Sequence, residues 1–346
     1  MSEKASTARE NRLGLTKSDY QGPPSTMCKG CGHDRISEAI TQAAFRLGLE
    51  SHRVVKMSGI GCSSKTPAYF LGRAYGLNGT HGRMPSFSTG AHVANHELIP
   101  IGVSGDGDTA SIGIGQFVHL ARRNSRMVYI VENNGIYGLT KGQFSATADL
   151  DSPSRRGIFP TEGPIDLCGL ALELGCSLVA RSFSGDKKQL IPLLQAALSF
   201  DGFAFLDVIS PCVTFNNHEA STKSYTYQKG HSVFFHDPTF VPVFEHIDID
   251  YGEGEDREVK MHDGSTLLLR KLEQDYDPHD RAGAFSTLAE TRSRGEVLTG
   301  LIYVNTEVKT LLKNLELTDT PLARLEGERL RPPPEALDEL NRSFRV

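Results

Sequence analysis

Apolar positions along the first part of this chain follow two periods in alternation. Short β-branched runs predict buried strands that close on glycine or asparagine turns, at residues 53–61, 98–108 and 127–135. Apolar residues at helical spacing predict helices at residues 36–49 and from Thr109 onward, and the segment 163–212 continues as helix, strand, helix and strand. This alternation predicts an α/β fold with a mostly parallel sheet and helices on both faces.

Several metal-binding or phosphate-binding residue types follow the predicted strands directly. Cys62, the Gly-Asp-Gly turn at residues 105–107, the pair Asn133 and Asn134, and Cys212 all stand where a strand ends. Ligands of parallel sheets bind at the carboxyl ends of the strands, which lie along one edge of the sheet. We therefore expect these residues to gather in one site.

The pattern changes after about Tyr251. An acidic, glycine-containing stretch begins there, and the remainder is charged, with a triple proline near Pro332. We predict a polar N-terminal tail at residues 1–20, a central domain that carries the motifs at residues 21–248, and a C-terminal extension at residues 249–346. The extension is expected to be partly ordered on another surface.

Composition restricts the class of protein. The 346 residues are 38% apolar and 23% charged, with a formal net charge of −5, and this mild acidity argues against a nucleic-acid-binding protein. No apolar run approaches the roughly 18 residues that a membrane span needs, and the polar N-terminus lacks the apolar segment of a secretory signal. Six cysteines without such a signal favour metal or redox use over disulfides, so we expect a cytoplasmic protein.

The sequence GDGD at residues 105–108 suits a phosphate. Its glycines let the backbone approach a phosphate closely, the helix that follows adds free N–H donors, and Asp106 can bind a divalent cation such as Mg²⁺. Gly-Asp-Gly alone occurs often by chance. Followed slightly under thirty residues later by Asn-Asn, it resembles the fingerprint of thiamine-diphosphate enzymes, which implies Mg²⁺ bound by Asp106, the Asn134 side chain and the Ile136 carbonyl.

Four cysteines are widely spaced: Cys28 and Cys31 form a C-x-x-C, and Cys62 and Cys212 stand alone. Such a set suits Zn²⁺ or an iron–sulfur cluster. Because the distant ligands meet only in a folded protein, the spacing favours a cluster within an enzyme domain, while simple burial of Cys62 and Cys212 is the structural alternative. The surrounding helical apolar pattern predicts core packing for the other two, Cys168 and Cys176.

Together these motifs resemble the β subunit of 2-oxoacid:ferredoxin oxidoreductases. The resemblance covers about residues 20–245 and rests on CKGCGH, GIGCSSKTPAYF, HGR, GDGD, ENNGIYGLTKGQ and SPCVTFN. It implies a thiamine-diphosphate-binding fold, a [4Fe-4S] cluster on the four cysteines, and an α subunit that completes the cofactor pocket, in αβ pairs that dimerise. This chain alone is then expected to be inactive.

The resemblance also implies the reaction and the residues of the site. A 2-oxoacid loses CO₂ on thiamine diphosphate, electrons leave singly through the cluster to ferredoxin, and coenzyme A takes the acyl group. His81 and Lys141 are the expected catalytic residues. The expected cofactor contacts are Gly61, Ser63, His81, Gly105, Asp106, Gly107, Asp108, Asn134, Ile136 and Tyr137.

Two lysines bear on the choice of substrate. Lys141 follows the Asn134 loop at a position that is typically small in relatives that use pyruvate, and Lys65 follows Cys62. A lysine can pair with a second carboxylate, so 2-oxoglutarate is the expected substrate. Three alternatives remain: the same chemistry on pyruvate or another 2-oxoacid, a thiamine enzyme without redox function, which would not need the cysteines, and a non-catalytic zinc-stabilised α/β subunit.

Overall fold

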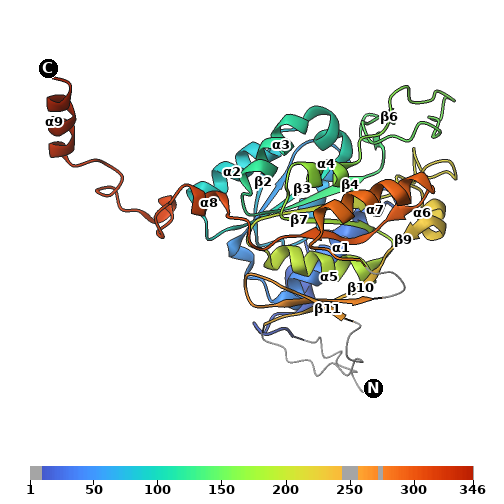
Figure 1. The fold of residues 1–346 in the computed structure, drawn as a ribbon, viewed down its shortest axis with the longest axis horizontal. Coiled ribbons are helices and arrows are strands. Elements are labelled where there is room, and N and C mark those ends of the chain that lie inside the picture. Colours follow the sequence, from blue (N-terminus) through green and yellow to red (C-terminus); the bar gives the residue numbers. More distant parts are fainter. Residues whose placement is uncertain (1–9, 244–255, 272–275, 346) are drawn as a thin grey trace, which may run out of the picture.

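A seven-stranded sheet forms the centre of the molecule (Figure 1). The computed structural model describes residues 10–243, 256–271 and 276–345. The sheet has the order β14-β7-β8-β4-β3-β1-β2, and all neighbours are parallel except the edge strand β14, which is antiparallel to β7. The strand bounds are β1 Val54–Ser58, β2 Tyr75–Asn78, β3 Ile99–Gly105, β4 Met127–Asn133, β7 Leu178–Phe183, β8 Phe203–Ile209 and β14 Gly300–Val304.

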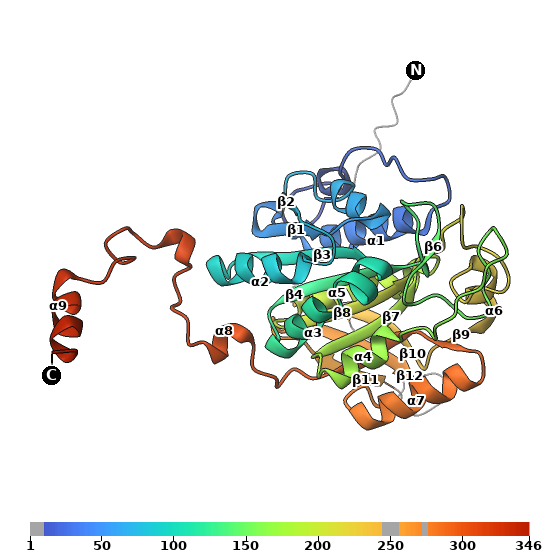
Figure 2. The same ribbon diagram turned by 90° about the horizontal axis from the view of Figure 1, so that it is seen from above.

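Helices cover both faces of this sheet (Figure 2). Helices α1 (Gly32–Leu47) and α5 (Lys187–Ser199) pack on one face. The opposite face is covered by α2 (Met84–Ala94), α3 (Ile114–Arg123), α4 (Leu167–Glu173) and α7 (Arg281–Ser293). The predicted α/β fold with helices on both faces is confirmed.

The central strand β4 is buried on both sides, and its side chains alternate between the two faces. Val128 and Ile130 belong to the core under α1 and α5, whereas Tyr129 and Val131 belong to the core on the other face. The alternation sends Glu132 toward α1. The next residue, Asn133, therefore faces α4 and α7.

Smaller elements surround the sheet. The loop after β4 forms a hairpin of β5 (Ile136–Tyr137) and β6 (Gln143–Phe144), and α6 spans Tyr225–His231. A three-stranded antiparallel sheet has the order β10-β12-β11, and β9 pairs with β13. The bounds are β9 Ser232–Val233, β10 His236–Val241, β11 Asp256–Lys260, β12 Thr266–Lys271 and β13 Val297–Leu298.

Single turns complete the described chain. Three short 3₁₀ helices are η1 (Lys17–Tyr20), η2 (Ser51–Arg53) and η3 (Cys62–Ala68). Beyond β14, α8 (Leu311–Asn314), the 3₁₀ turn η5 (Leu322–Arg324) and α9 (Pro334–Ser343) lead away from the body of the molecule (Figures 1 and 2). Among the described residues, no helix is both long and apolar enough to cross a membrane.

The helix expected from Thr109 is divided into two. A π-helical turn, η4 (Gly107–Ile112), precedes α3, and Gly113 separates them. The backbone approaches Gly82 so closely that a Cβ on Gly113 would lie 2.9 Å from the Gly82 Cα. This approach depends on a segment distant in sequence, and the local apolar pattern therefore gave no sign of it.

The two predicted ends of the chain also pack on the domain in part. Residues 1–9 of the expected tail and residues 249–255 of the expected extension lie outside the described residues. Tyr20 is fully buried and accepts a hydrogen bond from the Asn11 side chain at 2.9 Å. From the extension, β14 joins the main sheet. The predicted boundary at residue 249 stays a prediction.

Candidate functional site

One cavity lies at the carboxyl ends of β1, β3 and β4. All ten predicted cofactor contacts line it, together with Cys62, and the cavity has a volume of about 100 Å³. The register explains this convergence, because Gly105 at the end of β3 pairs with Glu132 at the end of β4. Its other lining residues are His33, Ile60, Glu132, Gly138, Leu139 and Thr140.

Asp106 is a buried carboxylate held only by neutral groups. It is 1% exposed, and its oxygens accept hydrogen bonds from Ser145 Oγ, from Thr147 Oγ1 at 2.7 Å and from the Asn134 backbone N–H at 3.4 Å. Burial raises its pKa despite these donors. No arginine or lysine of the described chain pairs with it, so a buried negative charge here calls for a cation.

The loop after β4 is shaped by Asn134. Its side-chain oxygen accepts a hydrogen bond from the Ile136 backbone N–H at 3.0 Å, and Gly135 between them has φ 74°, which favours glycine. The Tyr137 hydroxyl donates to the Gly107 carbonyl at 3.2 Å. A Cβ on Gly107 would lie 2.5 Å from the Tyr137 ring, so a larger residue at that position would displace the ring.

The Asp108 carboxylate connects the segment of His81 and Gly82 to the end of β3. It is 3% exposed and hydrogen-bonds to His81 Nδ1, while Gly82 N–H donates to the same carboxylate at 2.7 Å and Ser104 Oγ at 2.6 Å. The Ile60 backbone N–H lies 3.4 Å from it. Asp108 therefore orients the His81 ring, whose other nitrogen, Nε2, remains for a bound molecule.

The four cysteines of the predicted metal site lie near one another, and Cys62 among them lines this cavity. A Cβ on Gly138 would lie 3.5 Å from Cys62 Sγ and 3.9 Å from Cys212 Sγ. Burial raises the pKa of the Cys31 thiol to about 12, with a smaller contribution from Cys212, and burial raises that of Cys62, with contributions from Cys212 and Cys28. All four thiols are thus close enough to interact electrostatically.

Cys168 and Cys176 lie elsewhere. Both are fully buried in the core on the α4 face, and burial raises the pKa of each thiol. The predicted packing role is confirmed. In the described ranges, no three His, Cys, Asp or Glu side chains surround one point as a single bound ion requires. In an iron–sulfur cluster each thiolate binds a different iron, so its ligands stand farther apart than those of one ion.

The two predicted substrate lysines do not line the cavity. Lys65 and Lys141 are both exposed. Lys141 has φ 81°, a left-handed conformation that a lysine rarely adopts. Its backbone N–H donates to the Gly138 carbonyl at 3.2 Å, which ties Lys141 to the loop beside the cysteines.

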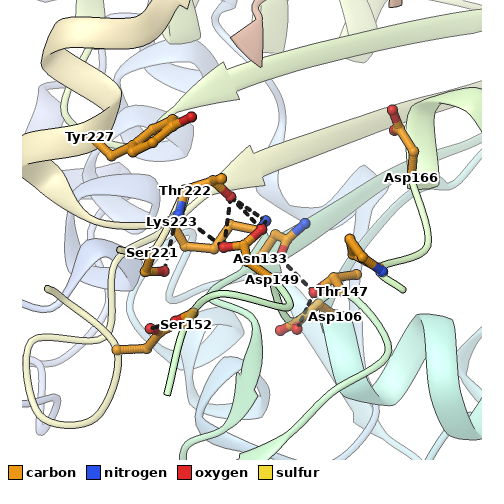
Figure 3. A network of polar contacts seen from close by, with 12 residues as sticks. Asp106, Asn133, Thr147, Asp149, Ser152, Asp166, Ser221, Thr222, Lys223 and Tyr227 are labelled. Atoms are coloured by element: carbon orange, nitrogen blue, oxygen red, sulfur yellow. Dashed lines mark hydrogen bonds and ion pairs between the residues drawn. The ribbon is translucent and has the colours of Figure 1, made fainter. Parts of the chain in front are cut away.

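Sequence reasoning missed a buried polar network on the other face of the sheet (Figure 3). Asn133 donates to Asp207 at 2.9 Å, and Thr147 Oγ1 lies 3.0 Å from Asn133 and 2.7 Å from Asp106. Arg181 pairs with Asp207 at 2.9 Å and also with Asp166. In the sequence, only the Asn-Asn motif pointed to this network, because the residues that Asn133 contacts are distant from it along the chain.

This network borders a second cavity. Lys223 closes one wall, where its ammonium lies 3.1 Å from Asp149, and Thr222 donates to the same carboxylate at 2.8 Å (Figure 3). Although burial opposes it, the Arg181 guanidinium lowers the pKa of Asp166. The charges that line the network are therefore mutually paired and support the Asp106 loop from behind.

Comparison with known proteins identifies the class. Residues 59–208 match the family described as thiamine pyrophosphate enzyme, C-terminal TPP binding domain. Fold, cavity and family match together define a thiamine-diphosphate-binding domain. The chain is 40% identical over 217 residues to the 2-oxoacid:ferredoxin oxidoreductase subunit beta of Saccharolobus solfataricus. These aligned residues cover 62% of this chain and 70% of that protein. It belongs to the β subunits of 2-oxoacid:ferredoxin oxidoreductases, as its motifs predict.

Two further relatives narrow the comparison. The chain is 35% identical over 193 residues to the 2-oxoglutarate synthase subunit KorB of Methanocaldococcus jannaschii, covering 56% of this chain and 71% of that protein. A solved 2-oxoglutarate:ferredoxin oxidoreductase from Magnetococcus marinus, with 2-oxoglutarate, coenzyme A and succinyl-CoA bound, superposes with a TM-score of 0.73 at 28% identity. That match covers 96% of this chain and 97% of the other.

Proposed function

We propose that this chain is the β subunit of an enzyme that converts 2-oxoglutarate and coenzyme A to succinyl-CoA and CO₂, with ferredoxin as the electron acceptor. The family makes it an oxidoreductase subunit. The choice of 2-oxoglutarate is supported by the relative named 2-oxoglutarate synthase subunit and by the solved relative with 2-oxoglutarate bound. The observation that carries the proposal is the single cavity lined by Cys62 and all ten predicted cofactor contacts.

The diphosphate end of the cavity fits a hard cation. Asp106, the Asn134 side chain and the Ile136 carbonyl are oxygen donors of the kind that Mg²⁺ prefers. The fit rests on Asp106, a buried carboxylate with only neutral partners. In the proposal these three groups hold Mg²⁺ against the diphosphate, and the loops closed by Gly107 and Tyr137 exclude water around it.

The cysteine side of the cavity fits a [4Fe-4S] cluster. The soft sulfur donors Cys28, Cys31, Cys62 and Cys212 interact in pairs, and Cys62 lines the cofactor cavity. When bound, thiamine diphosphate supplies an electron sink for decarboxylation and the cluster supplies one-electron transfer. Gly138 leaves the space between Cys62 and Cys212 open.

His81 has a role that its contacts support. Its Nδ1 is bonded to Asp108, which fixes the ring and leaves Nε2 facing a molecule in the cavity. In the proposal Nε2 holds or moves a proton on the substrate, the work for which histidine is best suited near neutral pH.

Lys141 and Lys65 would bind the second carboxylate of 2-oxoglutarate at the entrance. Both are exposed, so each can reach a ligand only from the rim of the cavity. For Lys141, the left-handed backbone at φ 81° supports a functional role, since such strain persists mostly where function retains it. Glycine would fit that backbone more easily.

The test exchanges this lysine. Lys141→Gly should raise KM for 2-oxoglutarate about tenfold, the usual worth of a charge-assisted contact, and leave KM for pyruvate nearly unchanged. Oxoacid-dependent reduction of a viologen dye, measured anaerobically on the complex with the α subunit, gives both values. Lys188→Gly is the control, because Lys188 is an exposed lysine on α5 that lines a different pocket. Equal changes for the two oxoacids would overturn the assignment of 2-oxoglutarate.

The partners complete the proposal. We infer an α subunit that supplies the rest of the pocket, so that the β chain alone is inactive, and a dimer of αβ pairs that uses coenzyme A and ferredoxin. Iron and acid-labile sulfide in the purified complex distinguish this enzyme from a zinc-stabilised subunit. The cytoplasmic location stays a prediction.

A further inference from the structure

Glu132 stands at the centre of a buried polar cluster that the proposed reaction does not use. Thr66 Oγ1 lies 2.9 and 3.0 Å from the two oxygens of its carboxyl group. His33 Nδ1 lies 3.5 Å from the same group and 2.6 Å from Ser210 Oγ. Glu132, Thr66 and Ser210 are fully buried, and His33 is 2% exposed.

Each partner of Glu132 belongs to a different cysteine-bearing segment. His33 follows Cys31 by two residues at the start of α1. Thr66 follows Cys62 within the same 3₁₀ helix, η3. Ser210 precedes Cys212 by two residues at the end of β8. One carboxyl group on β4 therefore links, directly or through His33, all three segments that carry the four cysteines.

The groups of this cluster are buried, so hydrogen bonds must satisfy them. Glu132 has no arginine or lysine partner among the described residues, and burial lowers the pKa of His33 to about 4, so the ring is neutral. Burial raises the pKa of Glu132 well above its usual value. Buried polar groups are stable when they are hydrogen-bonded, so the Thr66–Glu132 bond holds η3 to β4, and the His33–Ser210 bond holds the start of α1 to the end of β8 beside Glu132.

The carboxyl group also lies close to the thiols. It lines the same cavity as Cys62, and it lies 3.5 Å from His33, which follows Cys31 by two residues. Groups that lie just behind metal ligands orient them, and their loss typically costs about 10- to 100-fold in metal affinity.

We propose that Glu132 is a positioning residue that sets the three cysteine-bearing segments at the spacing a cluster needs. This inference rests on the proposed function for the identity of the cluster. The positions of the thiols themselves can be tested without any metal.

The first experiment labels thiols in the metal-free full chain. Iodoacetamide labelling, followed residue by residue by mass spectrometry, should show Cys31 and Cys62 reacting severalfold faster in Glu132→Leu than in the unmodified chain. Cys168 and Cys176 are internal controls, because both are buried far from Glu132, and their rates should not change.

Two milder variants keep the test valid should Glu132→Leu fold poorly. Glu132→Gln keeps the length of the side chain and an acceptor for Thr66, and should restore labelling close to the unmodified rates. Thr66→Val cuts only the bond to η3, so it should speed the labelling of Cys62 and leave Cys31 unchanged.

The second experiment measures iron in the complex with the α subunit, reconstituted anaerobically. Glu132→Leu should bind iron with an affinity lower by about tenfold or more, while Glu132→Gln stays near the unmodified value. The matched control is Gln189→Leu. Gln189 is 4% exposed and bonds Ser182 and Thr299 at a distance from the cysteines, so this variant loses buried hydrogen bonds without touching the cluster.

The outcomes distinguish the positioning role of Glu132 from the proposed iron–sulfur cluster. Unchanged thiol labelling in both Glu132→Leu and Thr66→Val would overturn the positioning role, as would equal iron loss in Gln189→Leu and Glu132→Leu. An unmodified complex that binds no iron, combined with faster labelling in the variants, would overturn the proposed cluster and leave Glu132 as the residue that positions the thiols.

Discussion

At the scale of single residues, two neighbours on β4 face different cavities on opposite sides of the sheet: Glu132 lines the cavity of the predicted cofactor contacts, and Asn133 lines the second cavity. Glu132 holds the cysteine-bearing segments on the α1 face, and Asn133 contacts Asp207 and Thr147 on the other face. Asn134, the next residue, turns into the cavity itself. Two of these three consecutive residues therefore line the site, and Asn133 supports it from the other face through Thr147, which bonds Asp106.

Lys56 on β1 is a buried lysine without a carboxylate partner among the described residues. It is 6% exposed, its ammonium donates to the Phe70 carbonyl at 2.9 Å, and it lies 5.5 Å from the centre of the Phe70 ring. Burial lowers the pKa of this ammonium to about 8. The charged form is therefore a cost to folding at neutral pH.

We expect Lys56→Met to stabilise the chain at pH 7, by at most about 3 kcal/mol from the size of the pKa shift. Because the folded pKa lies below the unfolded one, the stability of the unmodified chain should rise relative to the variant from about pH 8 to about pH 10.5. Urea unfolding of both chains at pH 7 and pH 10 measures the difference. A variant that is less stable at pH 7 would contradict this account.

The residues of the proposed diphosphate site were predicted from the sequence to lie together, and those of the Glu132 cluster were not. Asp106 and Asn134 stand in short motifs that follow strands, so their meeting follows from the parallel sheet. His33, Thr66 and Ser210 are ordinary polar residues in sequence. Only the packing of three distant segments brings them to Glu132.

At the scale of elements, close backbone approach decides the shape of the loop after β3. Gly107 lies against the Tyr137 ring of the β5 hairpin, and Gly113 lies against Gly82. The π-helical turn η4 accommodates both approaches before regular helix begins at Ile114. Such turns within helices are frequently found at functional sites.

Gly107→Ala should weaken thiamine diphosphate binding. The new methyl would force the Tyr137 ring to move, and overpacking of this kind typically costs about 1–3 kcal/mol, or roughly tenfold in affinity. Isothermal titration of the complex with thiamine diphosphate and Mg²⁺ measures it.

Gly115→Ala is the matched control for this variant. Gly115 lies on α3 with no atom within 4 Å of a new Cβ, so alanine should leave binding unchanged and raise stability by roughly 0.5–1 kcal/mol. If both variants bound thiamine diphosphate equally well, the contact between Gly107 and Tyr137 would have no part in shaping the pocket.

Strands were the easiest elements to predict and the loop after β3 the hardest. The continuous β-branched runs of β1, β3 and β4 reflect burial on both faces, which is a local property of the sequence. The division of the helix at Gly113 depends on contact with Gly82, which no local pattern contains.

At the scale of the whole molecule, the chain ends in a segment that contributes little to the body. The last anchors are an ion pair of Arg324 with Glu97 at 2.6 Å and a contact of His96 with the Thr318 carbonyl. Beyond them lie α9 and its flanks, with large exposed apolar side chains at Leu330, Leu337, Leu340 and Phe344.

Removal of residues 326–346 should leave the thermal unfolding midpoint of the chain unchanged, since the described part of this segment buries almost nothing. Differential scanning calorimetry of the full and shortened chains measures it. Removal of residues 297–346 is the contrasting control. It deletes β14 from the main sheet and should lower the midpoint strongly. A clear shift from the shorter deletion would contradict the exposed arrangement.

The α/β architecture was predictable at this scale, but the position of β14 was not. The alternation of strands and helices specifies a parallel sheet covered on both faces. The strand β14 comes from a charged, irregular region of the sequence. Its five residues are all buried, and they pair with β7 at the edge of the sheet.

The spacing of the cysteines has a consequence for biosynthesis. Cys28 and Cys31 leave the ribosome early, while Cys212 follows β8, which must insert between β7 and β4 before the thiols can meet. Until then the early thiols have no partners and are open to oxidation. We therefore expect loading of the proposed cluster to be a late step, possible only after β8 has joined the sheet.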